Sequence, residues 1–132
     1  MQKTKLLLVS TCIHNATTVL SGILQDKGYD CLHIQSLKAL EIVHNNYQPH
    51  MILAQHHEMD NSDLQSLIYQ YSRQMPLVVL MWMPGLKQGK MMRFLNFGIL
   101  QIDSLNDPCI MYTIESETKQ RRNELVRLEK SS

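Results

Sequence analysis

Apolar positions occur along the chain in short runs separated by segments with helical spacing. Three runs are apolar almost throughout: the strand predicted over residues 5–10, the one that follows Pro49, and the one over residues 77–81. A short continuous apolar run is typical of a strand buried on both faces, as in the centre of a parallel sheet. Two further runs, over residues 31–34 and 99–102, mix apolar and polar positions, which favours strands at the edges of the sheet.

Helical segments connect the predicted strands, and several carry residues suited to capping. Asn15 can cap the first helix, and Ser36 can cap the second. Ser62 opens a capping-box pattern before the third helix. Pro108, preceded by Asn-Asp, fits the first turn of a long last helix.

A further connecting helix is expected after the loop marked by Pro84 and Gly85. Met91, Phe94 and Leu95 would form its inner face, because they stand three and four positions apart. This helix would complete a series of five β–α units.

The order of these units predicts a doubly wound α/β fold. Alternating strands and helices favour a parallel sheet with right-handed crossovers. Three apolar and two mixed strands fit a five-stranded sheet of order 2-1-3-4-5, in a flavodoxin-like sandwich of three layers. Residues 1–118 would form this single domain, and residues 119–132 a helical extension.

Composition narrows the possible partners. The 132 residues are 44% hydrophobic and 19% charged, as in an ordinary globular domain, and the net charge of +1 gives no reason to expect nucleic acid. Three widely spaced cysteines favour reduced thiols in a cytoplasmic protein. The apolar run near the N-terminus is too short for a signal peptide or a membrane span.

The pattern resembles the receiver domain of bacterial response regulators over residues 4–118. The likeness rests on a Lys-Leu-Leu-Leu-Val opening, on Pro49 before the third strand, on Met-Pro-Leu-Val-Val-Leu at residues 75–80, and on Gly98 before the fifth strand. The resemblance implies a cytoplasmic role in two-component signalling.

The positions that carry the family's chemistry are replaced in this chain. Receivers have two acidic residues at the end of strand one, an acceptor aspartate at the end of strand three, a threonine or serine after strand four and a lysine after strand five. The residues at these places are Ser10, Thr11, Gln55, Met81 and, depending on register, Ser104 or Leu105.

Phosphoryl transfer to the residues at these places is therefore not expected. The reaction needs a nucleophilic oxygen and a Mg²⁺ ion, which prefers carboxylate ligands. Gln55 is a neutral amide, while Ser10 and Thr11 supply hydroxyl groups without charge. The sequence favours a degenerate, non-enzymatic receiver that needs no metal or cofactor.

A metal site would have to use polar residues after the third strand and in the first loop. Imidazole and thiolate groups suit zinc, but adjacent histidines on an extended chain point to opposite sides. Ordinary polar loop residues explain the same pattern. The residues concerned are His56, His57, Glu58 and Asp60, joined by Cys12 or His14.

The alternative function is a flavodoxin-like enzyme or ligand-binding domain that uses the loop around Cys12. A thiol before a helix N-terminus can be activated as a nucleophile. Phosphate-binding loops of this kind need glycine, which the loop lacks, and cysteine phosphatases need an arginine where Thr18 stands. The loop offers only hydroxyl groups, such as those of Ser10, Thr11 and Thr17.

A methionine-rich segment and the C-terminal tail are candidate partner surfaces. Methionine adapts to partners and tryptophan is common in interfaces, although core packing would explain the same residues. Heptad-like spacing in the tail could pair two protomers and connect to a downstream output domain of a transcription regulator. We therefore expect a homodimer, and the candidate residues are Trp82, Met83, Met91, Met92, Leu125 and Leu128.

Overall fold

The computed structural model is described over residues 3–12 and 15–130, with only the backbone considered from residue 120 onwards. Within this part the chain forms one six-stranded sheet with the order β2-β1-β3-β4-β6-β5. All neighbouring strands are parallel except β5 and β6, which are antiparallel. The strands are β1 (Lys5–Val9), β2 (Asp30–Ile34), β3 (Met51–Gln55), β4 (Leu77–Trp82), β5 (Lys90–Arg93) and β6 (Gly98–Ile102).

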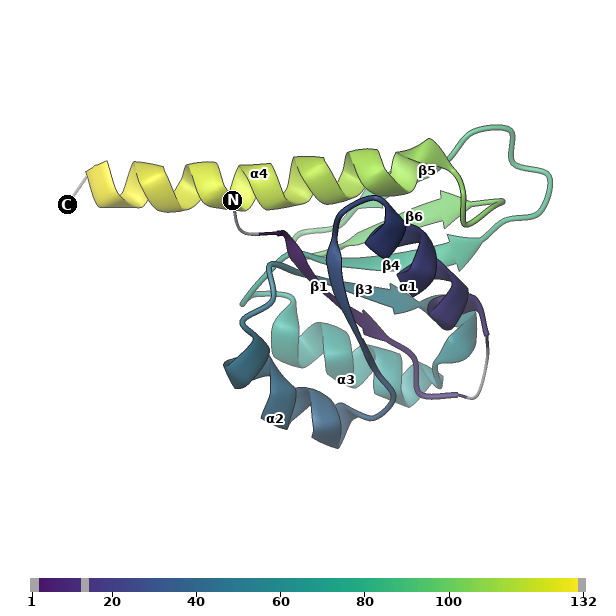
Figure 1. The fold of residues 1–132 in the computed structure, drawn as a ribbon, viewed down its shortest axis with the longest axis horizontal. Coiled ribbons are helices and arrows are strands. Elements are labelled where there is room, and N and C mark those ends of the chain that lie inside the picture. Colours follow the sequence, from purple (N-terminus) through teal and green to yellow (C-terminus); the bar gives the residue numbers. More distant parts are fainter. Residues whose placement is uncertain (1–2, 13–14, 131–132) are drawn as a thin grey trace.

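Helices cover both faces of this sheet, which confirms the predicted α/β class (Figure 1). Helices α1 (Ala16–Asp26) and α4 (Pro108–Lys130) share one apolar cluster with the sheet, and α2 (Leu37–Tyr47) and α3 (Asn61–Tyr71) share the other. Alternation along the strands divides the two cores, so that Leu6 and Leu8 face α1 whereas Leu7 and Val9 face α2. The apolar runs are therefore buried on both faces, as the sequence predicts.

The predicted helix between the fourth and fifth strands is wrong, and so are the strand count and the edge position of the fifth strand. That segment forms a loop followed by β5, which pairs with β6 and takes the edge position. Met91 does pack into the core beside α1 and α4, but from a strand. Phe94 and Leu95 are 50% and 96% exposed rather than turned inward.

The hairpin replaces the helix because a reverse turn follows β5 immediately. Phe94 N–H donates to the Phe97 carbonyl at 2.8 Å, which closes a tight turn through Leu95 and Asn96. The preceding loop is held against the start of α4 at Gly89, where a β-carbon would lie 2.8 Å from the Cys109 β-carbon. Spacing that fits a helix over so short a segment also fits a strand followed by a turn.

Helix starts agree with the sequence in three of four cases, although one of the predicted caps does not form. The Ser36 hydroxyl accepts a hydrogen bond from Ala39 N–H at 3.1 Å, and α4 begins at Pro108. Helix α3 begins before the predicted capping box, with Asp60 at the N-cap position. Asn15 occupies the N-cap position of α1, but its side chain makes no capping hydrogen bond.

Helix α4 runs without a break from the sheet into the expected extension. It crosses the predicted boundary at residue 118 and projects past the sheet (Figure 1). Over the described residues, none of the helices combines the length and apolar character needed to cross a bilayer. The side chains of Leu125 and Leu128 lie outside the described part of the chain.

Candidate functional site

Glu58 organises the carboxyl edge of the sheet. It ends a 3₁₀ turn, His56–Glu58, that directly follows β3, and its side chain is fully buried. One carboxylate oxygen accepts a hydrogen bond from Ala16 N–H at 2.9 Å, and the other accepts one from the Thr17 hydroxyl. Glu58 therefore supplies the cap that Asn15 does not, and places a negative charge at the positive end of α1.

The backbone of Glu58 also binds the loop after β1. Its carbonyl oxygen accepts hydrogen bonds from Thr11 N–H at 3.0 Å and Cys12 N–H at 2.9 Å. Phosphate-binding loops present free N–H groups at a helix N-terminus. In this chain three such groups, those of Thr11, Cys12 and Ala16, are already bonded to Glu58.

Gln55 lies at the end of β3 with its side chain buried. It is 1% exposed, and neither its amide nitrogen nor its amide oxygen has a hydrogen-bond partner among the described residues. Strand alternation turns it towards α1 and α4, because Leu53 belongs to their cluster and Ala54 to the opposite one. A buried neutral amide at this position gives the edge of the sheet neither charge nor a nucleophile.

Ser10 and His33 form a second polar contact at this edge. The Ser10 hydroxyl and His33 Nε2 are 2.6 Å apart, and Ser10 is buried. Burial lowers the pKa of His33 below its ordinary value, while the charge of Glu58 acts in the opposite direction. The arrangement favours a neutral imidazole bonded to the serine.

We expect His33 to make folding stability depend on pH. Its pKa is lower in the folded state than in the unfolded chain, where it is about 6.5. The unfolded chain therefore takes up a proton first, and the free energy of unfolding falls as the pH drops from 7 towards 5. The free energy of unfolding, measured by urea denaturation at several pH values in this range, should change less steeply with pH for His33→Asn than for the unmodified chain. Identical slopes would contradict the assignment.

The structure does not bring all five predicted pocket residues together. Ser10 and Thr11 follow β1 and Gln55 ends the neighbouring strand β3, so these three residues lie at the same carboxyl edge. Met81 directly follows Leu80, which lies in the α1 and α4 cluster, so Met81 points to the opposite face. Ser104 is exposed, and its hydroxyl accepts a hydrogen bond from Asn106 N–H within a turn.

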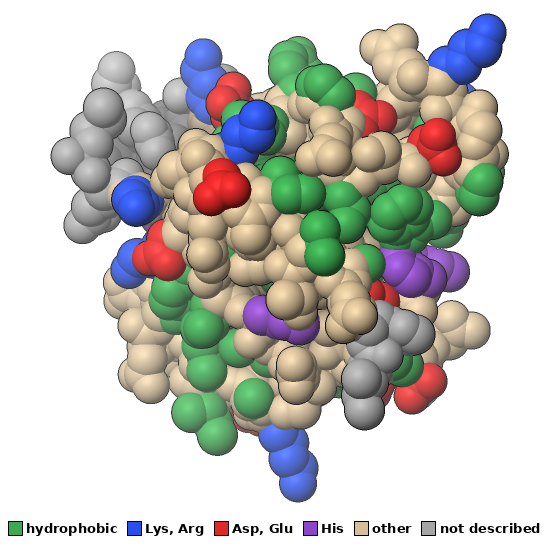
Figure 2. All heavy atoms as spheres, turned by 45° about the vertical axis from the view of Figure 1, so that its right-hand side comes forward, with side chains coloured by type: hydrophobic (Ala, Val, Ile, Leu, Met, Phe, Trp, Pro, Cys, Tyr) green, Lys and Arg blue, Asp and Glu red, His purple; other side chains and the backbone are tan. Residues whose placement is uncertain are grey.

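The histidine-rich segment after β3 packs against the protein. His57 Nε2 lies 3.9 Å from a Glu58 carboxylate oxygen, and its ring meets that of Trp82 edge-on at 5.5 Å. Over the described residues, His, Cys, Asp and Glu side chains do not gather into a group of three able to hold a metal ion. His14 lies outside the described residues. Figure 2 shows histidines beside hydrophobic side chains on this side, with lysine and arginine dispersed around the margin.

The predicted methionine-rich surface is divided between the two faces of the sheet. Met91 packs into the α1 and α4 cluster, whereas Met92 pairs with Ile99 on the other face. Trp82 is half-buried beside His57, and Met83 is 38% exposed. These residues therefore do not form one continuous patch.

A different apolar surface lies on the α3 side of β4, β6 and β5, and we call it the hairpin face. Met81, Met92 and Phe94 belong to neither buried cluster, while Phe97 and Ile99 pack only at the margin of one. Phe94 and Phe97 stack with ring centroids 4.9 Å apart. The predicted helix would have covered this face. Its residues are Met81, Met92, Phe94, Phe97 and Ile99.

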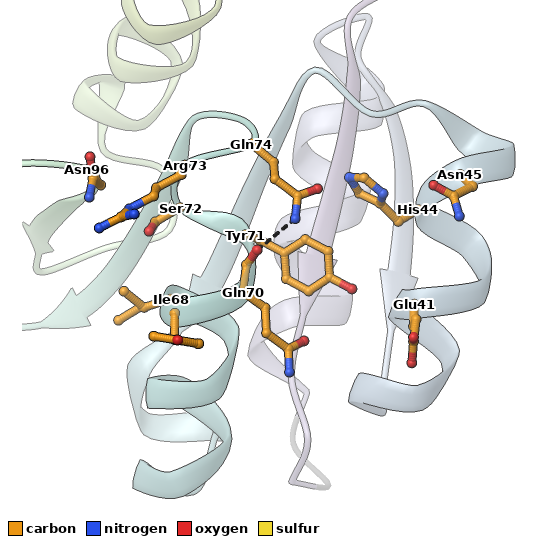
Figure 3. A pocket seen from close by; sticks show the side chains of 11 residues that line it. Glu41, His44, Asn45, Ile68, Gln70, Tyr71, Ser72, Arg73, Gln74 and Asn96 are labelled. Atoms are coloured by element: carbon orange, nitrogen blue, oxygen red, sulfur yellow. Dashed lines mark hydrogen bonds between the residues drawn. The ribbon is translucent and has the colours of Figure 1, made fainter.

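A groove of about 810 Å³ borders the hairpin face at the opposite, amino edge of the sheet (Figure 3). It runs between the C-terminal ends of α2 and α3 and reaches Asn96 in the hairpin turn. His44 and Tyr71 meet inside it with ring centroids 5.2 Å apart, and Arg73 lies on the side of Asn96. The mixed polar lining lacks a set of groups arranged for catalysis.

Glu58 and the hairpin face are the two features that sequence reasoning missed. Glu58 was one of several polar residues in a predicted loop, and its bonds join positions 41 and 42 residues apart. The only sequence signal was an acidic residue just after a buried strand. The hairpin face was hidden by the helix predicted to cover it.

Comparison of the sequence with protein-family models and with curated proteins gave no match. No protein-family model matches it, and no curated protein is significantly similar to it.

Proposed function

We propose that this chain is a non-enzymatic regulatory module, a degenerate receiver-like domain that acts by protein contact and controls an attached output in transcription regulation. The receiver resemblance, in its strand pattern and its landmarks, supplies the class of protein. The parallel strands β2, β1, β3, β4 and β6 and the helices on both faces are compatible with that class.

The observation that carries the proposal is the Glu58 carboxylate at the N-terminus of α1. It bonds to Ala16 N–H and to the Thr17 hydroxyl, so the helix N-terminus that a flavodoxin-like protein would leave free for phosphate is already occupied. A phosphate in this place would meet a buried negative charge. The same hydrogen bonds weigh against the alternative of an enzyme that uses the Cys12 loop.

Incubation with acetyl phosphate and Mg²⁺ tests the non-enzymatic part of the proposal. We expect no stable gain in mass, because Gln55 offers no nucleophile and Ser10 and Thr11 offer no charge to a metal. Intact-mass spectrometry measures the result, and a response regulator with an intact acceptor aspartate serves as the positive control. A phosphoryl group mapped to the segment after β3 would overturn the proposal.

We further propose that the chain forms a homodimer through the extension of α4. The helix continues past the sheet, and an isolated helix end of this length is marginal in water. Heptad-like spacing in the sequence would give two such ends an apolar seam. The residues at this spacing beyond the sheet are Thr118, Arg121, Leu125 and Leu128, whereas Ile114, which begins the pattern, is buried in the core of its own chain.

Sedimentation at micromolar concentration checks this prediction. We expect a dimer for the full chain and a monomer for a chain that ends at Lys119. Each leucine buried between two helices contributes roughly 1.5–3 kcal/mol at most, so loss of both should dissociate the pair. A monomeric full chain would refute dimerisation, and a dimer that survives truncation would exclude a role for the extension.

A further inference from the structure

The hairpin face belongs to a part of the chain that carries no acidic residue. Between Asp63 and Asp103 the sequence contains four basic residues and neither aspartate nor glutamate. Arg93 pairs with Glu117 of α4, on the other face of the sheet. The remaining three form no ion pair within the described residues: Arg73, Lys87 and Lys90.

Two of these cations lie at opposite ends of the hairpin face. Lys90 is exposed and alternates with Met91, so that it shares the face of Met92. It pairs with Gln101, near the carboxyl end of β6. Arg73 lies near the other end, because it lines the groove that reaches Asn96, just before β6 begins (Figure 3).

The size of this surface suits one short helix. Strand β6 has five residues, which span roughly 17 Å, or about three helical turns. Between the cations the surface is apolar and rich in methionine, a residue that adapts to different side chains. An occupant would need an apolar stripe to cover the sheet and negative charge near both ends.

We infer that the hairpin face binds an amphipathic helix of a partner protein, with acidic residues flanking its apolar stripe. This inference rests on the proposed function, because it names the partner through which the module would act. Burial of the methionine and phenylalanine side chains would supply affinity, and the two cations would set the orientation of the helix.

Other occupants fit the charge of this surface less well. A second hairpin face would bring cations against cations. The extension of another copy is also basic, since residues 119–132 contain five basic and two acidic residues. A single nucleic acid strand would need separate aromatic faces for its bases, but Phe94 and Phe97 stack on each other at an interplanar angle of 11°.

A titration with designed helical peptides tests the inference on the full chain. One peptide carries leucines on a single face with flanking glutamates, and its matched control carries lysines in place of those glutamates. The methyl signals of the methionines report binding by NMR. We expect the acidic peptide to shift the methyl signals of Met81 and Met92, whereas the signal of Met91, on the opposite face, should not change.

Charge reversal should weaken this binding selectively. We expect the double variant Lys90→Glu/Arg73→Glu to lose about tenfold in affinity for the acidic peptide. Lys38→Glu, at an exposed position of α2 away from the hairpin face, serves as the matched control and should stay within about twofold. Added salt should weaken binding to the unmodified chain.

Four results would overturn the inference. Equal affinity for both peptides would exclude an acidic helix as the partner of this surface. Shifts in the signal of Met91 without shifts in that of Met92 would exclude it as well. Shifts at Met81 and Met92 that depend on protein concentration alone would place a second copy there. Shifts caused by a thymidine oligonucleotide but not by the acidic peptide would indicate nucleic acid. The phosphorylation assay tests the proposed function separately, so a negative titration with no phosphorylation rejects only the acidic partner.

Discussion

Replacing Glu58 with alanine is expected to lower the free energy of unfolding by about 3–5 kcal/mol. The change leaves Ala16 N–H and the buried Thr17 hydroxyl without their acceptor, and each unsatisfied buried group costs roughly 1–3 kcal/mol. It also removes the negative charge from the N-terminus of α1. Urea denaturation monitored by circular dichroism measures the loss.

A double-mutant cycle separates the hydrogen bond from the general effect of truncation. Thr17→Val removes the hydroxyl with little change in shape, and we expect a coupling of about 1.5–3 kcal/mol with Glu58→Ala, typical of a bond to a charged group. Glu41→Ala, at an exposed position of α2, should change stability by less than about 0.5 kcal/mol. If Glu58→Ala costs no more than this control, the carboxylate does not hold the carboxyl edge together.

Gln55→Asp is expected to destabilise the fold without restoring phosphorylation. The new carboxylate would occupy a side-chain position that is 1% exposed, and burial raises a carboxyl pKa by up to 3–5 units. At about 1.4 kcal/mol per unit, the penalty at neutral pH is on the order of 4 kcal/mol. The loop after β1 would still offer no acidic partner for Mg²⁺, since Ser10 and Thr11 carry no charge, and the nearby Glu58 carboxylate is already bonded to α1.

The free energy of unfolding of Gln55→Asp should depend on pH in a direction set by its raised carboxyl pKa. A carboxyl group whose folded pKa is raised imposes no penalty below its unfolded pKa of about 3.9, and its penalty grows as the pH rises towards the folded pKa. Gln55→Asn introduces a side chain with the shape of aspartate but without its charge, so its stability should show no such trend with pH. A phosphorylated, Mg²⁺-binding Gln55→Asp variant would show that the hydroxyl groups suffice as metal partners.

The sequence predicts the central sheet well because burial on both faces leaves a direct mark on composition. Continuous apolar runs identify β1, β3 and β4, and the mixed run at β2 identifies a true edge strand. The other mixed run was misread. In β6 the buried positions Gly98, Leu100 and Ile102 alternate with partly covered ones, because one face packs under α4 and the other is the hairpin face.

The parts that the sequence did not predict depend on contacts between distant residues. Met91, Phe94 and Leu95 have helical spacing, and nothing in the local sequence excludes a helix. The segment around Met91 forms a strand because it pairs with β6. Glu58 is a polar residue in a segment where polar residues are expected. Its burial results from the packing of the α1 N-terminus against it, and the local sequence carries no sign of that contact. Gln55 was identified correctly as the residue at the end of the third strand, but its burial was not predicted.

The short edge strand also has a consequence for aggregation. An open β-sheet edge can recruit strands from other molecules, and natural proteins limit this with short edges and charged side chains. Strand β5 has only four residues, with exposed Lys90 and Arg93 at its ends. Strand β6 behind it is Gly-Ile-Leu-Gln-Ile, which has no charge of its own. Any change that detaches the hairpin therefore exposes an uncharged apolar edge, and self-association of sheets becomes the main hazard for this chain.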